Sequence, residues 1–148
     1  MLLLNQWSCG LWRNMMKHHF LPPHLVIKAG IHGLGIFTTK DIKKGDVIFT
    51  MKGSVLYKPT QTSVQIGRMM HIENPISAHV NHHCEPNSTV DRKKRSFIST
   101  KDIKKDEEIT FNYNQNEDTL ASPFVCACCH ISIKGKKFST KQKRKVTI

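Results

Sequence analysis

Short apolar runs, separated by glycines and charged residues, dominate the sequence from residue 25 onward. The clearest runs are at 25–27, 33–37 and 47–49, and such short runs punctuated by glycine are typical of strands. Helical periodicity is weak, and its best candidate is the segment 62–70. The pattern therefore predicts a mainly β protein, built of small sheets with few short helices.

Two later segments carry most of the polar groups that are suited to chemistry. Residues 106–113 (DEEITFNY) alternate, which would place Ile109, Phe111 and Tyr113 on one face of a strand. Residues 81–87 (NHHCEPN), called the polar loop below, contain a proline that disfavours a helix or a central strand. By themselves the first segment is typical of a core strand, and the second of a turn with self-bonding asparagines.

An internal repeat connects two of the apolar regions. The six residues TKDIKK occur at 39–44 and again at 100–105. Each copy follows one apolar run and precedes another, so we expect two similar polar turns that link strands. Two copies are too few for a solenoid.

The length of 148 residues fits a single domain with less ordered ends. Residues 1–24 hold both tryptophans and end near two consecutive prolines, so they are interpreted as a flanking segment. Residues 136–148 are interpreted as a basic tail. Its cluster at 141–145 (KQKRK) is either a solvated end or a nuclear-import or nucleic-acid-binding patch.

The charge balance of 23 Lys and Arg against 11 Asp and Glu gives a net charge of +12. This charge predicts attraction to nucleic acid, chromatin or anionic membrane surfaces and does not choose among them. The chain turns polar after residues 1–4, and no apolar run approaches the roughly 18 residues of a membrane-spanning helix. We expect a nuclear or cytoplasmic protein with no secretory signal or transmembrane segment.

Five cysteines are present, and Cys126, Cys128 and Cys129 crowd into four positions. This spacing is poor for disulfides among the three and good for a metal, so a reducing compartment is expected. One interpretation of the polar loop is that its Cys84 shares a metal site with these later cysteines.

The Gly33-Leu34-Gly35 sequence lies between two strand-like runs rather than at the start of a helix. It therefore fails the structural context of a dinucleotide-binding fingerprint. Two glycines one residue apart allow a backbone to approach a ligand closely, although a plain tight turn explains them equally well.

In combination, these features resemble the SET-domain methyltransferases over about residues 25–135. The resemblance lies in the order and spacing of five motifs. They are Gly33-Leu34-Gly35-Ile36-Phe37, the Asp-Ile-x-x-Gly turn at 41–45, the polar loop, the strand at 107–113, and Phe124-x-Cys126-x-Cys128.

The resemblance implies a SET-type fold, in which the polar loop lies beside the strand ending at Tyr113 in a knot-like crossing that builds the active site. It divides the chain into a SET domain at 25–120 and a partial post-SET segment at 121–135. It further implies a protein-lysine methyltransferase that uses S-adenosylmethionine, with Tyr113 as the catalytic tyrosine. The implied cofactor-binding residues are His32, Gly33, Leu34, Gly35, Asn81, His82 and Phe124, and the implied walls of the lysine channel are Phe111 and Tyr57.

The implied chemistry requires mainly alignment, because a sulfonium donor carries an already activated methyl group. The target lysine must lose a proton, and an apolar channel beside a cation would depress its ordinary pKa of about 10.4. Phe111 occupies a position where the family has phenylalanine or tyrosine. Because phenylalanine omits a hydroxyl and leaves room for a methylated amine to react again, we predict di- or trimethylation.

The cysteine pattern departs from the family. Relatives with a complete post-SET segment hold zinc with the loop cysteine and three later ones, but direct spacing places the third later position here at Ile133. Cys129 or His130 would substitute only in a shortened loop, so zinc and a set of structural thiols both stay open. The candidate zinc ligands are Cys84, Cys126, Cys128 and Cys129.

The remaining histidines carry no predicted role. His83 stands where the family has serine, and no function is assigned to this change. The histidines without partners at metal-ligand spacing are His18, His19, His24, His71 and His79.

The expected partner is a protein substrate with a target lysine, such as a histone or another basic protein. A homodimer that completes the substrate groove and contact with nucleic acid or nucleosomes through the basic surface are further hypotheses. The alternative function is a catalytically inactive SET-like module that binds chromatin or nucleic acid. The net charge of the chain favours this alternative. However, the aromatic residues of the chain are not interleaved with basic ones, as stacking platforms would require.

Overall fold

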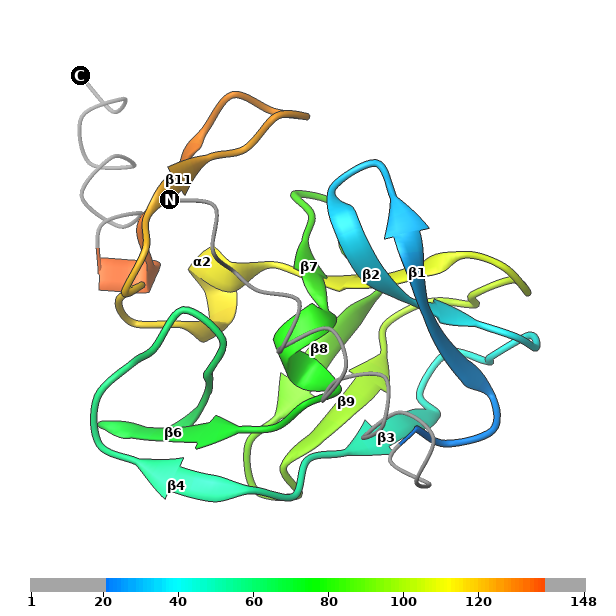
Figure 1. Ribbon diagram of the computed structural model, residues 1–148, viewed down its shortest axis with the longest axis horizontal. Coiled ribbons are helices and arrows are strands. Elements are labelled where there is room, and N and C mark those ends of the chain that lie inside the picture. Colours follow the sequence, from blue (N-terminus) through cyan, green and yellow to red (C-terminus); the bar gives the residue numbers. More distant parts are fainter. Residues whose placement is uncertain (1–20, 138–148) are drawn as a thin grey trace, which may run out of the picture.

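Small β-sheets account for most of the regular secondary structure in the computed structural model, which describes residues 21–137 (Figure 1). The sheet that positions the candidate site has the order β1-β2-β10-β7. Its strands are β1 (Leu25–Gly30), β2 (Gly33–Thr38), β10 (Glu108–Phe111) and β7 (Asn81–His82). Because β10 pairs antiparallel with β2 and parallel with β7, it lies between two segments that are distant in sequence.

Further small sheets complete the part of the fold that the structure describes. One has the order β3-β9-β8, from β3 (Val47–Thr50), β9 (Ser96–Ser99) and β8 (Ser88–Asp91). Another has the order β4-β6-β5, from β4 (Ser54–Leu56), β6 (Met70–Glu73) and β5 (Val64–Gly67). The last pairs β11 (Phe124–Val125) with β12 (Ser132–Ile133). Helical structure includes the 3-10 helix η1 (Ser77–His79) and the one-turn helix α2 (Tyr113–Asn116).

The apolar core is formed by the inward-facing residues of these sheets. Ile36 and Ile109 are fully buried and lie directly opposite each other on β2 and β10. Phe97 of β9 stacks on Phe49, with ring centroids 4.8 Å apart, and meets Phe111 edge to face at 5.1 Å, both favourable aromatic geometries. The end of β10 is therefore held firmly against the core.

The mainly β prediction is confirmed, and strands cover the three apolar runs expected to form them. The helix expected at 62–70 is wrong, because this segment forms β5, a turn and the first residue of β6. Three consecutive residues of β5 are buried, which no helical stripe allows, and Met69 in the turn has a φ of +55°. The polar Gln65 is itself buried and bonded, to the Gly67 carbonyl and to Asp118.

The strand expected to end at Tyr113 is shorter than predicted. β10 ends at Phe111, and the Asn112 side chain accepts a hydrogen bond from the Asn114 N–H at 3.0 Å. Asparagine at this position is a helix N-cap, so Tyr113 becomes the first residue of α2. Ile109 and Phe111 are buried as the alternation predicts, and Tyr113 also packs against the core.

The polar loop lies beside β10, in the crossing that the resemblance implied. Asn87 fastens the two segments: its amide donates to the Glu108 carbonyl at 2.8 Å and accepts from the Thr110 N–H at 2.9 Å. The His83 N–H donates to the Phe111 carbonyl at 3.1 Å. These bonds satisfy polar groups that the crossing buries, and they fix the loop side chains relative to β10.

The two copies of the sequence repeat form the polar turns that were expected, and they face each other. Ile42 and Ile103 exchange two backbone hydrogen bonds of 2.8 Å. The aspartate of each copy also accepts a hydrogen bond from a lysine N–H of the other copy, at 2.9 and 2.8 Å. The identical sequences therefore make one reciprocal contact.

The ends of the chain, residues 1–20 and 138–148, lie outside the described residues. The predicted flanking segment 1–24 and basic tail 136–148 fall mostly there. Among the helices of residues 21–137, none has the length and apolar character needed to cross a membrane.

Candidate functional site

An open cavity of about 510 Å³ lies beside α2. Its walls come from the β1–β2 turn, the segment 60–64, the start of η1, the polar loop, the junction of β10 with α2, and the segment 120–127. Figure 1 shows β7 and α2 between the β1–β2 hairpin and the segment that carries β11. Of the predicted cofactor and channel residues, those that line the cavity are His32, Asn81, His82, Phe111, Tyr113 and Phe124.

Tyr113 is held in this wall by both its backbone and its side chain. Its hydroxyl donates a hydrogen bond to the Val80 carbonyl at 2.7 Å, and its ring lies 4.7 Å from that of Phe111. Burial, and then the negative charges of Glu117 and Glu108, raise the pKa of the Tyr113 hydroxyl well above its ordinary value. The phenol therefore stays protonated and acts as a hydrogen-bond donor at physiological pH.

His82 connects the polar loop to Tyr113 through its side chain. Its Nδ1 accepts a hydrogen bond from the Tyr113 N–H at 3.1 Å, so the ring proton belongs on Nε2, which lies 3.6 Å from Cys84 Sγ. Burial, followed by the nearby charges of His83 and His32, lowers the pKa of His82 to about 4. A neutral imidazole thus bridges the start of α2 and the cysteines.

Asn81 joins the glycine-containing strand to β10. Its amide donates to the Leu34 carbonyl at 3.1 Å and to the Glu108 carboxylate at 2.8 Å. A Cβ atom at Gly35 would collide with that carboxylate and approach the Asn81 amide to 3.1 Å, so a side chain there would displace the Glu108 carboxylate from its bond with Asn81. The Gly33-Leu34-Gly35 motif therefore allows the close approach of the polar loop to β2.

Phe124 of β11 closes the aromatic side of the cavity. Its ring meets those of His82 and Tyr113 edge to face, with centroids 5.8 and 6.0 Å apart. Its side chain is 40% exposed, which leaves part of the ring available to a bound molecule. Phe124, predicted from a family motif, is thus brought to Tyr113.

Other predicted residues are not brought into the cavity lining. Gly33, Leu34 and Gly35 lie in β2 next to His32, and the Leu34 side chain is 56% exposed. Tyr57 is 72% exposed and follows β4, outside the lining of the cavity. The structure therefore gives no support to Tyr57 as a channel wall.

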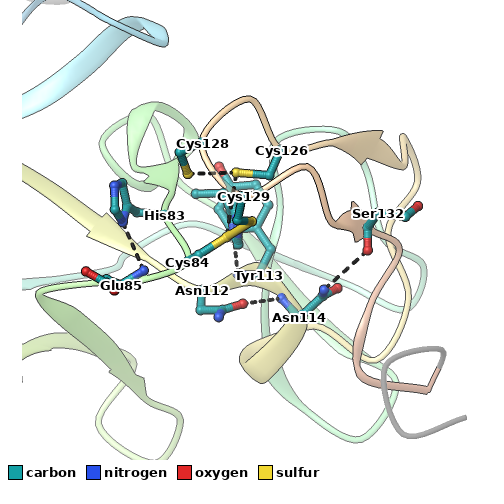
Figure 2. The surroundings of a disulfide bond; sticks show 11 residues. His83, Cys84, Glu85, Asn112, Tyr113, Asn114, Cys126, Cys128, Cys129 and Ser132 are labelled. Carbon is teal, nitrogen blue, oxygen red and sulfur yellow. Dashed lines mark hydrogen bonds between the residues drawn. A yellow bond between two sulfur atoms is a disulfide. The ribbon is translucent and has the colours of Figure 1, made fainter. Parts of the chain in front are cut away.

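Four cysteine sulfur atoms gather within 4.8 Å of one another (Figure 2), and one of them, Cys84 Sγ, lies 3.6 Å from His82 Nε2. Cys84 and Cys129 are joined as a disulfide, while Cys126 Sγ lies 3.7 Å from Cys84 Sγ and 3.0 Å from Cys128 Sγ. Burial alone would raise the pKa of the Cys126 thiol, but hydrogen bonds from Cys128 and from nearby backbone N–H groups hold that pKa below its ordinary value. We call these four residues the cysteine cluster.

The cysteine cluster has the number and type of ligands that a tetrahedral metal ion takes, although the 3.0 Å between Cys126 Sγ and Cys128 Sγ is shorter than the separation of two zinc-bound thiolates. Four thiolates at about 2.3 Å from zinc lie roughly 3.8 Å apart, close to the 3.7 Å between Cys84 and Cys126. The disulfide and a metal would use the same sulfur atoms, so they are alternative states. Ile133, at the position of the missing cysteine, is buried opposite Phe124 in the β11–β12 pair.

Glu117 is a cavity residue that sequence reasoning missed. It is 3% exposed, and both of its carboxylate oxygens lie 3.0 Å from the Gln65 backbone nitrogen and share its N–H as donor. The Asn116 side-chain amide donates a further hydrogen bond of 3.3 Å. Glu117 Oε2 lies 3.9 Å from Nδ1 of buried His71, which has no hydrogen-bond partner among the described residues. Burial raises the pKa of Glu117 to about 7. No motif marks this pair, because it joins β6 to the end of α2.

A Glu117→Gln variant should change how stability depends on pH. Glu117 has an ordinary pKa of 4.5 and a pKa of about 7 in the folded protein. The free energy of unfolding of the wild type therefore falls by on the order of 3 kcal/mol as pH rises between these values. The amide cannot titrate and can still accept from Gln65. The difference in unfolding free energy, variant minus wild type, should therefore rise from pH 4.5 to pH 8.

Urea unfolding of both proteins at pH 4.5, 6 and 8 measures this difference. Parallel stability curves for wild type and variant would contradict a raised pKa at Glu117.

Several histidines without a predicted role have local contacts. His24 Nε2 lies 2.7 Å from the Ile48 carbonyl, and His79 Nδ1 lies 2.9 Å from the Pro75 carbonyl. His83 Nδ1 accepts a hydrogen bond from the Glu85 N–H at 2.9 Å (Figure 2). The histidine that replaces serine thus stabilises the turn of the polar loop.

Comparison with known proteins is consistent with this geometry. The family model of the SET domain matches residues 33–114. A curated relative, the variant-silencing SET domain-containing protein of Plasmodium falciparum (isolate 3D7), is 30% identical over 125 residues. The match covers 65% of this chain and 5% of that relative, so the chain spans a small part of the relative's length.

Solved structures share the fold. The crystal structure of KRYPTONITE in complex with mCHH DNA, H3(1-15) peptide and SAH has a TM-score of 0.56 at 18% identity, over 70% of this chain and 27% of that chain. A humanized mutant of the Chaetomium thermophilum Polycomb Repressive Complex 2, bound to the inhibitor GSK126, has a TM-score of 0.52 at 18% identity, over 75% of this chain and 18% of that chain. The predicted SET-type fold is confirmed.

Proposed function

The chain belongs to the SET-domain family, whose members are protein-lysine methyltransferases, and on this basis we propose that it transfers a methyl group from S-adenosylmethionine to a lysine of a protein substrate. The observation that carries the proposal is the composition of one cavity. It gathers motif residues from separate parts of the chain, namely His32, Asn81, His82, Tyr113 and Phe124.

The cavity suits the cofactor in size and chemistry. A volume of about 510 Å³ with aromatic walls and a few polar groups is typical of a nucleotide-sized ligand site. The part-exposed Phe124 ring offers a surface for a base, while Asn81 and the backbone beside His32 offer polar contacts. Bound there, S-adenosylmethionine would supply an activated methyl group on a sulfonium.

The protein's own contribution is to present a neutral, aligned amine. Phe111 and Tyr113 give the cavity an aromatic wall, whose low polarity disfavours the ammonium form of a lysine. The Tyr113 hydroxyl is fixed by its bond to the Val80 carbonyl, so it offers an oxygen at a defined position to orient the amine. Alignment of this kind supplies most of the acceleration in a reaction whose donor is already activated.

Transfer of labelled methyl from S-adenosylmethionine to histones, and to the proteins of a cell lysate, tests the proposal. We expect label on lysine side chains, identified by mass spectrometry of the labelled band. No label on any protein, together with no binding of the cofactor in calorimetry, would contradict the proposal.

We propose a histone as the substrate class. One support is that a solved structure of the same fold, KRYPTONITE, contains an H3(1-15) peptide together with SAH. Another is the net charge of +12, which favours an encounter with chromatin rather than with an isolated basic protein.

The degree of methylation should depend on Phe111. Its ring is 3% exposed and packs between Phe97 and Tyr113 at the cavity wall. We expect the wild type to form di- or trimethyl-lysine, because the ring leaves no hydroxyl to hold a methylated amine in place. Phe111→Tyr should shift the products toward monomethyl-lysine.

Product mass spectra at saturating cofactor measure this shift. Phe37→Tyr is the matched control, since Phe37 lies on β2 outside the cavity, against Lys28. Only monomethyl-lysine from the wild type, or the same shift in both variants, would contradict the role of Phe111.

We also propose that the cysteine cluster holds one zinc ion when its four thiols are reduced. The four sulfur atoms from the polar loop and the segment 126–129 support this ligand set. Zinc there would fasten β11, and with it Phe124, to the polar loop.

A further inference from the structure

A second concavity, of about 310 Å³, also lies at the β10–α2 junction. Of the residues that the structure describes, Phe111 alone lines both concavities. The remaining lining of this second concavity comes from β8, from α2 with its cap, and from Lys136 near the end of the described chain. It is therefore separate from the cavity proposed to hold the cofactor.

The lining of this concavity is cationic. Arg92 and Lys136 contribute to it together with polar side chains such as Thr89 and Gln115, and none of the described residues that line it is acidic. The buried Glu117 carboxylate, outside this lining, interacts with the charge of Arg92. The Arg92 guanidinium donates a hydrogen bond to the Asn116 carbonyl, which fixes one edge of the group and leaves further N–H donors. Two cations among uncharged donors favour an anion.

Further basic residues are neighbours in sequence of Arg92 and Lys136. The turn between β8 and β9 has the sequence RKKR at 92–95, in which Lys93 and Lys94 are exposed. The nearest acid in sequence, Asp91, accepts a hydrogen bond from the Lys94 N–H at 3.1 Å. On the side of Lys136, the exposed Lys134 and Lys137 extend the charge. We call the set of Arg92–Arg95, Lys134, Lys136 and Lys137 the basic face.

The other lysine-rich surface is different in composition. The paired turns at 39–46 and 100–107 contain six lysines, but five acidic residues are interspersed among them. Two of these acids accept backbone hydrogen bonds across the pair of turns. Opposite charges in that surface offset one another, so the strong local excess of positive charge lies on the basic face.

We propose that the basic face binds the phosphodiester backbone of duplex nucleic acid, with one phosphate seated between Arg92 and Lys136. The chemistry fits a backbone rather than bases, because the basic face contains no aromatic side chain on which a base could stack. Bound at this place, the duplex leaves the cavity lined by Tyr113 and Phe124 open. The site is thus independent of the proposed methyl transfer and could hold a methyltransferase on DNA beside its substrate.

Binding of a labelled duplex DNA, followed by fluorescence anisotropy over a range of salt concentrations, tests this site. The test variant replaces Lys93, Lys94 and Lys136 by alanine in the full chain. Each phosphate contact contributes about 0.9 to the slope of log affinity against log salt. We expect the slope to fall by up to about 2.7, with affinity at low salt reduced more than 10-fold, on the order set by three lost contacts.

The matched control replaces Lys43, Lys44 and Lys104 by alanine, which removes the same charge from the paired turns. We expect its affinity and slope to stay close to those of the wild type. Equal losses in the two triple variants would show an effect of net charge alone and overturn the site. Unchanged binding in the test variant, or binding to vesicles of anionic lipid in place of DNA, would overturn it as well.

A Tyr113→Phe variant separates this site from the proposed function. It should bind duplex DNA like the wild type, and the Lys93, Lys94 and Lys136 variant should still methylate a free peptide at the wild-type rate. Failure of methyl transfer with salt-sensitive DNA binding intact would leave the basic face standing and remove only the proposed activity.

Discussion

Replacing Tyr113 by phenylalanine is expected to lower the rate of methyl transfer by about 100-fold or more, because small displacements of a reacting group cost this much. The hydroxyl is buried beside Phe111, and its bond to the Val80 carbonyl gives it one fixed position. Without it, the lysine amine keeps an apolar channel but loses the oxygen that orients it. The loss should therefore appear in kcat more than in KM.

The same substitution should leave the fold and the cofactor cavity nearly intact. It removes one hydrogen bond, worth about 1 kcal/mol net, while the ring contacts with His82 and Phe124 remain. Circular dichroism and calorimetric titration with S-adenosylmethionine, before the rate measurement, establish that the variant is folded and binds cofactor.

Tyr57→Phe is the matched control, since it makes the same chemical change at a tyrosine that is 72% exposed and outside the cavity. Its methyl transfer should equal that of the wild type. A comparable loss in both variants, or full activity in Tyr113→Phe, would contradict the assignment of Tyr113.

Sequence reasoning predicted the parts of the site that lie in short, ordered motifs. Asn81 and His82 are adjacent, and Phe111 and Tyr113 share one segment, so their types and spacing are visible without a structure. The parallel pairing of Thr110 with Asn81 and of Phe111 with His82 then joins the two segments. The order of the motifs was sufficient to predict this part of the site, because each of the two paired segments is a complete motif.

The parts that sequence reasoning missed depend on contacts between side chains that carry no pattern. Glu117 and His71 meet because the β5–β6 hairpin packs on the end of α2, where the Gln65 N–H binds the Glu117 carboxylate. Residues 62–70, which include the first strand of that hairpin, were predicted as a helix, so its contacts could not be anticipated. The clustering of Arg92 with Lys136 likewise depends on the path of the chain after α2.

The cysteine cluster was predicted in composition but not in arrangement. Spacing placed the missing ligand at Ile133, which is instead buried against the β11–β12 pair. The chain turns sharply at His130, which has a φ of +57°, and this turn allows Cys129 to reach Cys84. Local backbone conformation decided which residue completes the set, and such a conformation leaves no periodic signal.

Chelation of the zinc, or substitution of one of its ligands, should abolish methyl transfer. Substitution of a ligand should also weaken zinc binding. His82 Nε2 lies 3.6 Å from Cys84 Sγ while its Nδ1 accepts from the Tyr113 N–H, so the cluster connects directly to the start of α2. Protein purified under reducing conditions should contain one zinc per chain by elemental analysis. Chelation should release it and expose β11 to proteolysis, since metal binding contributes strongly to the stability of such small segments.

Cys129→Ser is the decisive variant, because it removes a ligand that lies outside the family's spacing. Its zinc affinity should fall by more than the roughly 10- to 100-fold that loss of a partner outside the coordination shell costs. His130→Ala is the matched control next to it: His130 is not part of the four-sulfur set, so zinc content and activity should be retained. Zinc lost in His130→Ala but kept in Cys129→Ser would assign the fourth ligand to the histidine. No stoichiometric zinc in the reduced wild type would contradict the zinc site.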